Sequence, residues 1–287
     1  MSGLSGGTVD RLEVYVLAEE HASGMFWAQH GISFLLKVRS GEQVHEILFD
    51  TGNSWEPIEH NLRLLGQDVS RVKAVVLSHR HYDHTGGLRG LLTDLNREIT
   101  IISHPDLFRP NFVLPLREIG IPFTREELEG LGARFLLTRD PIEIVSGVVT
   151  TGEIPRTSEL EREMTIETYT VDVDGRLVRD PIMDDVSLIV KLRGGSVVLT
   201  GCSHAGVVNI VKRALEIAGP VRAVMGGFHL VSASEERIEA TVRALRDLGV
   251  EQVITGHCTG LPAECAFRRP YGRGFAQLAV GKVFKFT

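Results

Sequence analysis

The chain has 287 residues, of which 43% are hydrophobic and 24% are charged, and its formal net charge is −6. This length suits one large α/β domain or two small ones, and the acidic balance gives a nucleic-acid partner no help from bulk electrostatics. The N-terminus lacks the basic and apolar regions of a signal peptide, and no apolar run approaches the roughly 20 residues that span a bilayer. We therefore expect a cytoplasmic protein with no membrane partner and no nucleic-acid partner.

The first part of the chain carries strand patterns that lead into a helix. Residues 1–10 are rich in glycine and serine and are expected to be flexible, so a single domain is expected over 11–287. The turn between the second and third strand patterns is short, which is typical of a hairpin. The expected elements are strands at 11–20, 31–40 and 43–50, a helix at 56–66 and a Val-rich strand at 72–78, which has the pattern of a strand buried on both faces.

The middle of the chain departs from this order. A helix is predicted over 86–96 and a strand over 98–103. From about 105 to 165 proline and charge are frequent, and the apolar pieces are short. We interpret 105–165 as an excursion of loops and short helices within the domain, in the position of a lid.

The last part of the chain repeats the order of the first, with hairpins followed by alternating helix and strand. Two β-rich layers that face inward with helices outside would bury all of these apolar patterns. The predicted fold class is therefore α/β, with a four-layer αβ/βα sandwich. The elements predicted here are hairpins at 168–178 and 185–201, helices at 206–219 and 234–249, and strands at 221–227 and 251–256.

The stretch that carries the chemistry is "VVLSHRHYDHTGG", which begins inside the Val-rich strand and runs past its end. It places His79, His81, Asp83 and His84 within six positions. Neutral imidazole and carboxylate are ligands of zinc and related divalent ions, and ligand sites concentrate at the C-terminal ends of strands in α/β sheets. The pattern therefore predicts a metal site on this loop.

At these residues the chain resembles the metallo-β-lactamase fold superfamily of metallohydrolases. The superfamily pattern HxHxDH matches in full over His79–His84, and "LFDTG" at 48–52 resembles the preceding strand and turn. The resemblance implies that Asp50 orients ligands and that His257, in "VITGHCTG", is the final histidine of the site. It extends from about residue 12 to 286 and implies the metallo-β-lactamase type of sandwich.

A narrower resemblance is to the dihydropterin-aminobenzene ribofuranosyl phosphate synthase-like branch of this superfamily. The stretches that carry it are "AQHGISFLL", "LSHRHYDHTGGL", "TGCSHAGVVNI" and "GGFHL". The resemblance implies a condensation of a dihydropterin diphosphate with an aminobenzene-ribosyl phosphate.

One departure from the superfamily pattern lies after the strand "SVVLTG". A typical member with two metals has a bridging aspartate here, whereas this chain has Cys202. A thiolate also binds or bridges zinc, and the alternative is a small buried residue. Cys258 follows His257 directly, and its side chain is expected to point elsewhere. Cys265, on a predicted helix, is expected in the core.

A second departure is a missing histidine, because none occurs between Pro105 and Ser203. Three residues are candidates to replace it. His204 lies two residues after Cys202 and is favoured, as a ligand or as a proton donor; Glu153 is an oxygen ligand in the right part of the chain; and His229, in "GGFHL", is favoured as a residue that faces the substrate.

These residues predict an enzyme with two divalent metal ions, and zinc is the expected ion, with iron and manganese as alternatives. The expected function is a hydrolase that directs a metal-activated water at an ester or phosphodiester bond of a small, phosphorylated substrate. The alternatives are the synthase of the branch and a di-iron redox or sensor module. The predicted catalytic residues are Asp83, His204 and His229, and the predicted metal ligands are His79, His81, Asp83, His84, Cys202, His204 and His257. Arg156, Arg268 and Arg269 are candidate phosphate contacts. The sequence specifies neither the substrate nor the oligomeric state.

Overall fold

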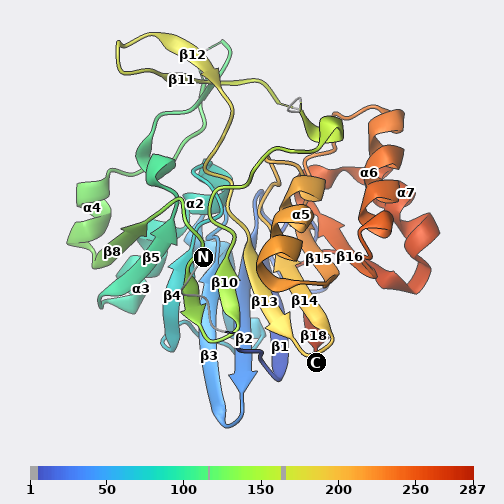
Figure 1. Cartoon of the computed structure of the whole chain (residues 1–287). Coiled ribbons are helices and arrows are strands. Elements are labelled where there is room, and N and C mark those ends of the chain that lie inside the picture. Colours follow the sequence, from blue (N-terminus) through green and yellow to red (C-terminus); the bar gives the residue numbers. More distant parts are fainter. Residues whose placement is uncertain (1–5, 116, 163–165) are drawn as a thin grey trace.

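The computed structural model describes residues 6–115, 117–162 and 166–287. Two seven-stranded sheets lie face to face, helices cover their outer faces, and a four-stranded sheet stands above one end of the sandwich (Figure 1). The expected four-layer αβ/βα sandwich is confirmed.

The first sheet combines an antiparallel N-terminal part with a parallel part. Strands β18, β1, β2 and β3 pair antiparallel, whereas β3, β4, β5 and β8 pair parallel. The parallel strands are connected through helices, so their C-terminal ends lie at one edge. The order is β18 (Val283–Phe286), β1 (Arg11–Ala18), β2 (Ser33–Ser40), β3 (Gln43–Phe49), β4 (Val72–Val76), β5 (Ile99–Ser103) and β8 (Ala133–Leu137).

The second sheet has the same construction. Strands β14, β15, β16 and β17 pair parallel, and β13, β10 and β9 continue the sheet antiparallel. The order is β17 (Phe275–Gln277), β16 (Gln252–Gly256), β15 (Val221–Gly227), β14 (Gly195–Leu199), β13 (Leu188–Leu192), β10 (Val148–Thr150) and β9 (Glu143–Val145).

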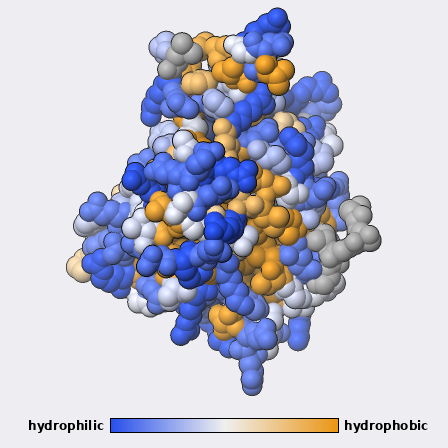
Figure 2. All heavy atoms as spheres, turned by 90° about the vertical axis from the view of Figure 1, so that its left-hand side faces the viewer, coloured by the Kyte–Doolittle hydropathy of each residue, from blue (hydrophilic) through white to orange (hydrophobic). Residues whose placement is uncertain are grey.

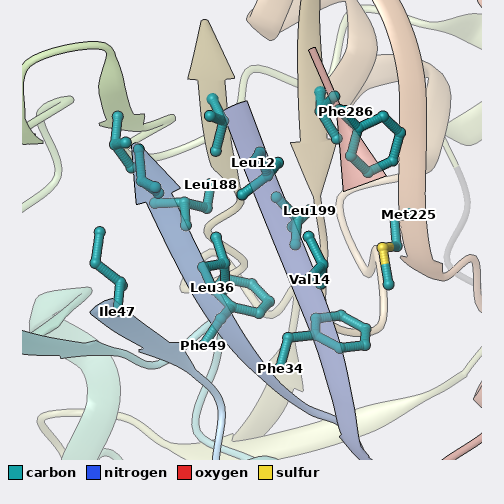
Figure 3. Packing of buried hydrophobic residues seen from close by; sticks show 14 of the residues in the cluster. Leu12, Val14, Phe34, Leu36, Ile47, Phe49, Leu188, Leu199, Met225 and Phe286 are labelled. Carbon is teal, nitrogen blue, oxygen red and sulfur yellow. The ribbon is translucent and has the colours of Figure 1, made fainter. Parts of the chain in front are cut away.

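Three apolar clusters correspond to the three interfaces between the four layers. The central cluster lies between the sheets and contains Leu36, Phe34 and Phe49 (Figure 3). The rings of Phe34 and Phe49 stack, with centroids 6.3 Å apart. One outer cluster packs α1 (Trp55–Leu64), α3 (Leu88–Leu95) and α4 (Arg125–Gly130) on the first sheet, and the other packs α5 (Val207–Ala218), α6 (Glu235–Asp247) and α7 (Leu261–Tyr271) on the second. The short helices are α2 (Tyr82–Thr85), η1 (Pro105–Phe108), η2 (Glu159–Glu161), η3 (His257–Thr259) and η4 (Gly272–Gly274).

The segment 105–165 is only in part the excursion that the sequence suggests, because three of its strands belong to the two large sheets. Its strand β8 forms the edge of the first sheet, and β9 and β10 extend the second. The edge strands β8 and β9 have mostly half-buried or exposed positions, which give only a weak apolar pattern, and β10 is buried but only three residues long. Residues 163–165 of the predicted lid lie outside the described residues.

The four-stranded sheet joins one part of this segment to a later hairpin. Its order is β12 (Leu177–Asp180), β11 (Thr168–Val171), β6 (Phe112–Val113) and β7 (Arg117–Glu118). Figure 2 shows apolar surface at the top of the molecule, where this sheet lies. Val173, in the turn between β11 and β12, is fully exposed. The hairpin predicted over 168–178 is therefore confirmed, but it belongs to a sheet of its own.

The N-terminal boundary lies earlier than predicted. Of the segment expected to be flexible, residues 1–5 lie outside the described residues. Val9 is buried in the central cluster, bridges Leu192, and its N–H donates to the carbonyl of Lys191 at 2.8 Å. The prediction of flexibility is therefore wrong for Val9, because its side chain fills a gap between the sheets.

No helix among the described residues is long and apolar enough to cross a membrane.

Phe49→Ala tests the central core. The substitution removes a fully buried ring, so the free energy of unfolding should fall by about 3–5 kcal/mol. Val173→Ala is the matched control, since this side chain is fully exposed, and its effect should stay within about 0.5 kcal/mol. Urea unfolding followed by circular dichroism measures both, and equal values for the two variants would contradict this packing.

Candidate metal centre

The predicted ligands come from strand ends in both sheets and meet at one edge of the sandwich. The motif His79–His84 follows β4 of the first sheet. Cys202 and His204 follow β14, and His257 follows β16, both in the second sheet. Because the sheets face each other, the C-terminal ends of their parallel strands bring these side chains together.

Three histidines form the first ligand set. One side-chain nitrogen from each of His79, His81 and His204 lies within 4.8 Å of the others, and their ring centroids are 4.6–4.8 Å apart. Burial lowers the pKa of His79 and His204 well below the usual value and that of His81 to about 4. All three imidazoles are therefore neutral at pH 7, which is the form that binds a metal.

Three ring nitrogens of this set lack a hydrogen-bond partner among the described residues. Nε2 of His79 and both ring nitrogens of His204 are buried without a hydrogen-bond partner among the described residues. Nε2 of His81 lies 3.0 Å from Oδ1 of Asn111, so Nδ1 is the nitrogen of His81 that would bind a metal ion. Unpaired buried polar atoms cost free energy, and a cation coordinated by the three imidazoles would remove that cost. The residues present therefore fit a metal ion.

Asp83, His84, Cys202 and His257 form the second set, with donor atoms that also lie within 4.8 Å of one another. Sγ of Cys202 is 3.2 Å from Nε2 of His84 and 3.2 Å from Nε2 of His257, and Oδ2 of Asp83 is 3.4 Å from each of these nitrogens. Burial opposes charge on His84, yet Asp83 and Asp50 raise its pKa to about 9. The rings of His79 and His84 are 4.2 Å apart, so the two sets adjoin.

The structure separates the three candidates for the missing histidine. His204 completes the first set, and the ring of His229 lies beside it with centroids 4.5 Å apart. Glu153 lies in neither set, because its Oε2 pairs with Nε2 of His104 at 3.1 Å and Nε of Arg139 at 3.2 Å. Of the three candidates, His204 is the one whose ring nitrogen lies within 4.8 Å of nitrogens of His79 and His81.

Asp50 holds both sets in place, as the resemblance implies. One of its oxygens accepts from the N–H of Ser78 at 2.7 Å, and the other lies 2.7 Å from both the Ser78 hydroxyl and Nδ1 of His84. The Ser78 hydroxyl also lies 2.9 Å from Nδ1 of His79. The backbone of Asp50 is in the left-handed region, with φ of 57°, which turns its carboxylate back toward the site. These contacts fix ring orientation for a ligand from each set.

Comparison with known proteins identifies the fold family. Residues 45–257 match the model of the metallo-beta-lactamase superfamily. The chain belongs to this superfamily. A solved metal-dependent hydrolase of the β-lactamase superfamily is 30% identical, with a TM-score of 0.82 over 96% of this chain and 99% of that one. A diphosphatase of the PhnP family is 12% identical, with a TM-score of 0.51 over 97% and 98%, and shares the fold.

A sequence relative corrects the expected activity. The 7,8-dihydropterin-6-methyl-4-(β-D-ribofuranosyl)-aminobenzene-5′-phosphate synthase of Methanocaldococcus jannaschii is 41% identical over 98% of both chains. This relative supports an enzyme and confirms the resemblance to its branch, but it overturns the hydrolase expected from the motif. The loop His79–His84 indicates a metal site of this superfamily, and superfamily metal sites alone do not distinguish hydrolysis from group transfer.

Three residues that contact the predicted ligands, Glu19, Glu20 and Asn111, are not predicted from the sequence. Oε1 of Glu20 accepts from Nδ1 of His257 at 2.8 Å and of His30 at 2.6 Å, and Oε1 of Glu19 accepts from the N–H of His257 at 2.7 Å. Burial opposes charge on Glu20, but these two histidines hold its pKa below the usual range. Glu19 and Glu20 could have been predicted as contacts, because "AEE" at 18–20 lies at the end of the strand predicted over 11–20. Asn111 gave no signal, since it lies in an irregular segment.

A buried arginine ties the four-stranded sheet to the motif. The guanidinium of Arg80 forms ion pairs with Asp180 and Asp184, and the backbone N–H of Arg80 donates to Oδ2 of Asp184 at 2.9 Å. Asn111, which directly precedes β6, donates from Nδ2 to Asp180 at 2.8 Å, and its Oδ1 lies 3.0 Å from Nε2 of His81. The ligand loop is therefore held from outside the sandwich.

Two cysteine predictions and one arginine prediction change with the structure. The side chain of Cys258 points toward the site, not away, since its Sγ lies within 4.8 Å of Sγ of Cys202. Cys265 is exposed on α7 and not in the core. Arg156 donates to backbone carbonyls, including that of His204 at 3.1 Å, so it supports the loop.

Asp50→Asn tests the support of the ligands. The amide cannot reproduce a carboxylate that accepts from Ser78 and His84, so zinc affinity should fall about 10–100-fold. Competition with a chromophoric chelator measures the affinity, and Asp247→Asn, at an exposed position, is the control. Equal affinity of the two variants would contradict the role given to Asp50.

Glu161→Gln tests a buried carboxyl group beside the His204 loop. Burial raises its pKa to about 7, from 4.5, although it accepts from the first N–H groups of α5. The folded protein thus binds the carboxyl proton of Glu161 more tightly than the unfolded chain does. The stability that this proton contributes is therefore lost as the pH rises from 4.5 to about 7.

Unfolding of the metal-free protein at pH values below, within and above this interval checks the effect. Relative to wild type, Glu161→Gln should gain up to roughly 3 kcal/mol as the pH rises. Glu251→Gln, at an exposed position, should show no such gain. A pH-independent difference between Glu161→Gln and wild type would show that this carboxyl group does not titrate there.

Proposed function

We propose that the protein is a synthase that joins a dihydropterin to a ribofuranosyl-aminobenzene 5′-phosphate. The observation that carries this proposal is the 41% identity to the Methanocaldococcus jannaschii synthase over 98% of both chains. The resemblance of four separate stretches to the same branch supports it, because they include residues of both ligand sets.

The proposed reaction is a displacement in which atoms and electrons balance. The aminobenzene nitrogen forms a bond to the methylene carbon of a dihydropterin diphosphate, and the bond from that carbon to the diphosphate oxygen breaks. The diphosphate leaves with the electron pair, and the amine nitrogen loses one proton. No oxidant or reductant is needed.

The proposed ligands are the two sets described above, with one divalent ion for each. Three imidazoles in one set and a thiolate in the other favour zinc, and iron and manganese remain alternatives. When bound, such ions supply Lewis-acid stabilisation of negative charge on phosphate oxygens. The support for two positions is that His79–His84 contributes to both sets while Cys202 and His204 fall in different ones.

The chain's own side chains then orient the substrate and carry the proton. We assign substrate contact to His229, which is half-buried beside His204. His30 is half-exposed, and its Nε2 lies 3.4 Å from Oδ2 of Asp83 while Nδ1 is held by Glu20. Asp83 and His30 therefore offer a path for the amine proton toward solvent, and in this assignment His204 is a ligand and not a proton donor.

A direct assay tests the proposal. Metal-loaded protein incubated with the dihydropterin diphosphate and the aminobenzene-ribosyl phosphate should form the condensed product and release diphosphate, detected by mass spectrometry. His84→Ala should lower kcat/KM by more than about a hundredfold, since changes around ligands alone cost 10–100-fold. His45→Ala, at a position outside the described ligand sets, is the control. No product from the metal-loaded wild type would contradict the proposal.

A further inference from the structure

We propose that Cys202, Cys258 and His229 form a third metal position, which takes a thiophilic divalent ion and shares Cys202 with the second set. One donor atom from each of these three residues lies within 4.8 Å of the others. The two ligand sets assigned above use neither Cys258 nor His229, and one ring nitrogen of His229 binds the ion in this proposal while the other faces the substrate.

The three residues follow neighbouring strands. Cys202 follows β14, His229 follows β15, and Cys258 lies in η3 directly after β16. The middle strand leaves room for them at Gly227, where a Cβ atom would lie 2.7 Å from Sγ of Cys258. A side chain at this position would push the Cys258 thiol out, so the glycine keeps the two sulfur atoms close.

Hydrogen bonds aim the Cys258 thiol at this point. Its Sγ accepts from the N–H of His229 at 3.3 Å and donates to the carbonyl of Cys202 at 3.6 Å. The backbone of His229 is left-handed, with φ of 47°, an uncommon conformation for a residue other than glycine. The loop after β15 is thus bent in a way that brings both its backbone and its imidazole to the thiol.

The ligand chemistry selects the class of ion. Two thiolates and one imidazole make a set that zinc uses with a fourth position open, and soft sulfur ligands disfavour manganese and magnesium. Cys202 already contacts His84 and His257, but a thiolate sulfur has more than one lone pair and bridges two ions. The third position therefore extends the second set and does not compete with it.

Cobalt titration of the metal-free protein tests this proposal, in the presence of a reductant that keeps the thiols free. Wild-type protein should bind three equivalents of Co²⁺, and the third should increase the thiolate-to-cobalt charge-transfer absorption. Cys258→Ser should bind two equivalents with a weaker charge-transfer band. Cys265→Ser is the matched control, because this cysteine is exposed on α7, and it should behave as wild type.

A second variant and the wild type itself keep the test decisive if Cys258→Ser folds poorly. His229→Asn keeps both thiols and should also lose the third equivalent. Saturation of the wild type at two equivalents, or an unchanged count and band in Cys258→Ser and His229→Asn, would overturn the third position. These readouts measure bound metal and not product, so their failure leaves the proposed synthase activity untouched.

Discussion

The contact of Cys202 with His84 and His257 is the interaction on which the site depends. Its sulfur lies 3.2 Å from a nitrogen of each histidine, one supplied by the first sheet and one by the second. This contact exists only because the central apolar cluster holds the two sheets at a fixed separation. Packing between the sheets therefore sets the spacing of the ligands, and a change in the core would reach the metal centre.

Two opposing contributions determine the free energy of this arrangement. Burying several imidazoles and a carboxylate removes them from water, which destabilises the protein wherever these groups lack partners. Asp50, Glu20 and Asn111 offset part of that cost by fixing individual ring nitrogens. The remaining nitrogens of His79 and His204 are buried without a hydrogen-bond partner among the described residues, so bound cations are expected to stabilise the fold as well as to serve the reaction.

The sequence predicts the sandwich and much of the site because both depend on local patterns. The Val-rich strands, the hairpins and the cluster His79–His84 are contiguous, and each ligand follows a strand that the pattern detects. Asn111 and the orientation of Cys258 are not predicted because their contacts depend on how distant segments meet, whereas Glu20 could have been predicted from its place at a strand end. The short edge strands within 105–165 escape because half-buried residues leave little periodicity. The activity was predicted wrongly because the motif describes the metal ligands and says little about the bond that is formed or broken.

Anomalous X-ray scattering from crystals of the zinc-loaded protein, collected on both sides of the zinc absorption edge, tests the central claim most directly. The claim predicts one peak among His79, His81 and His204 and a second among Asp83, His84, Cys202 and His257, separate from any peak at the proposed third position beside Cys258 and His229. A single peak in the first set, with Sγ of Cys202 outside bonding distance of any ion, would contradict it.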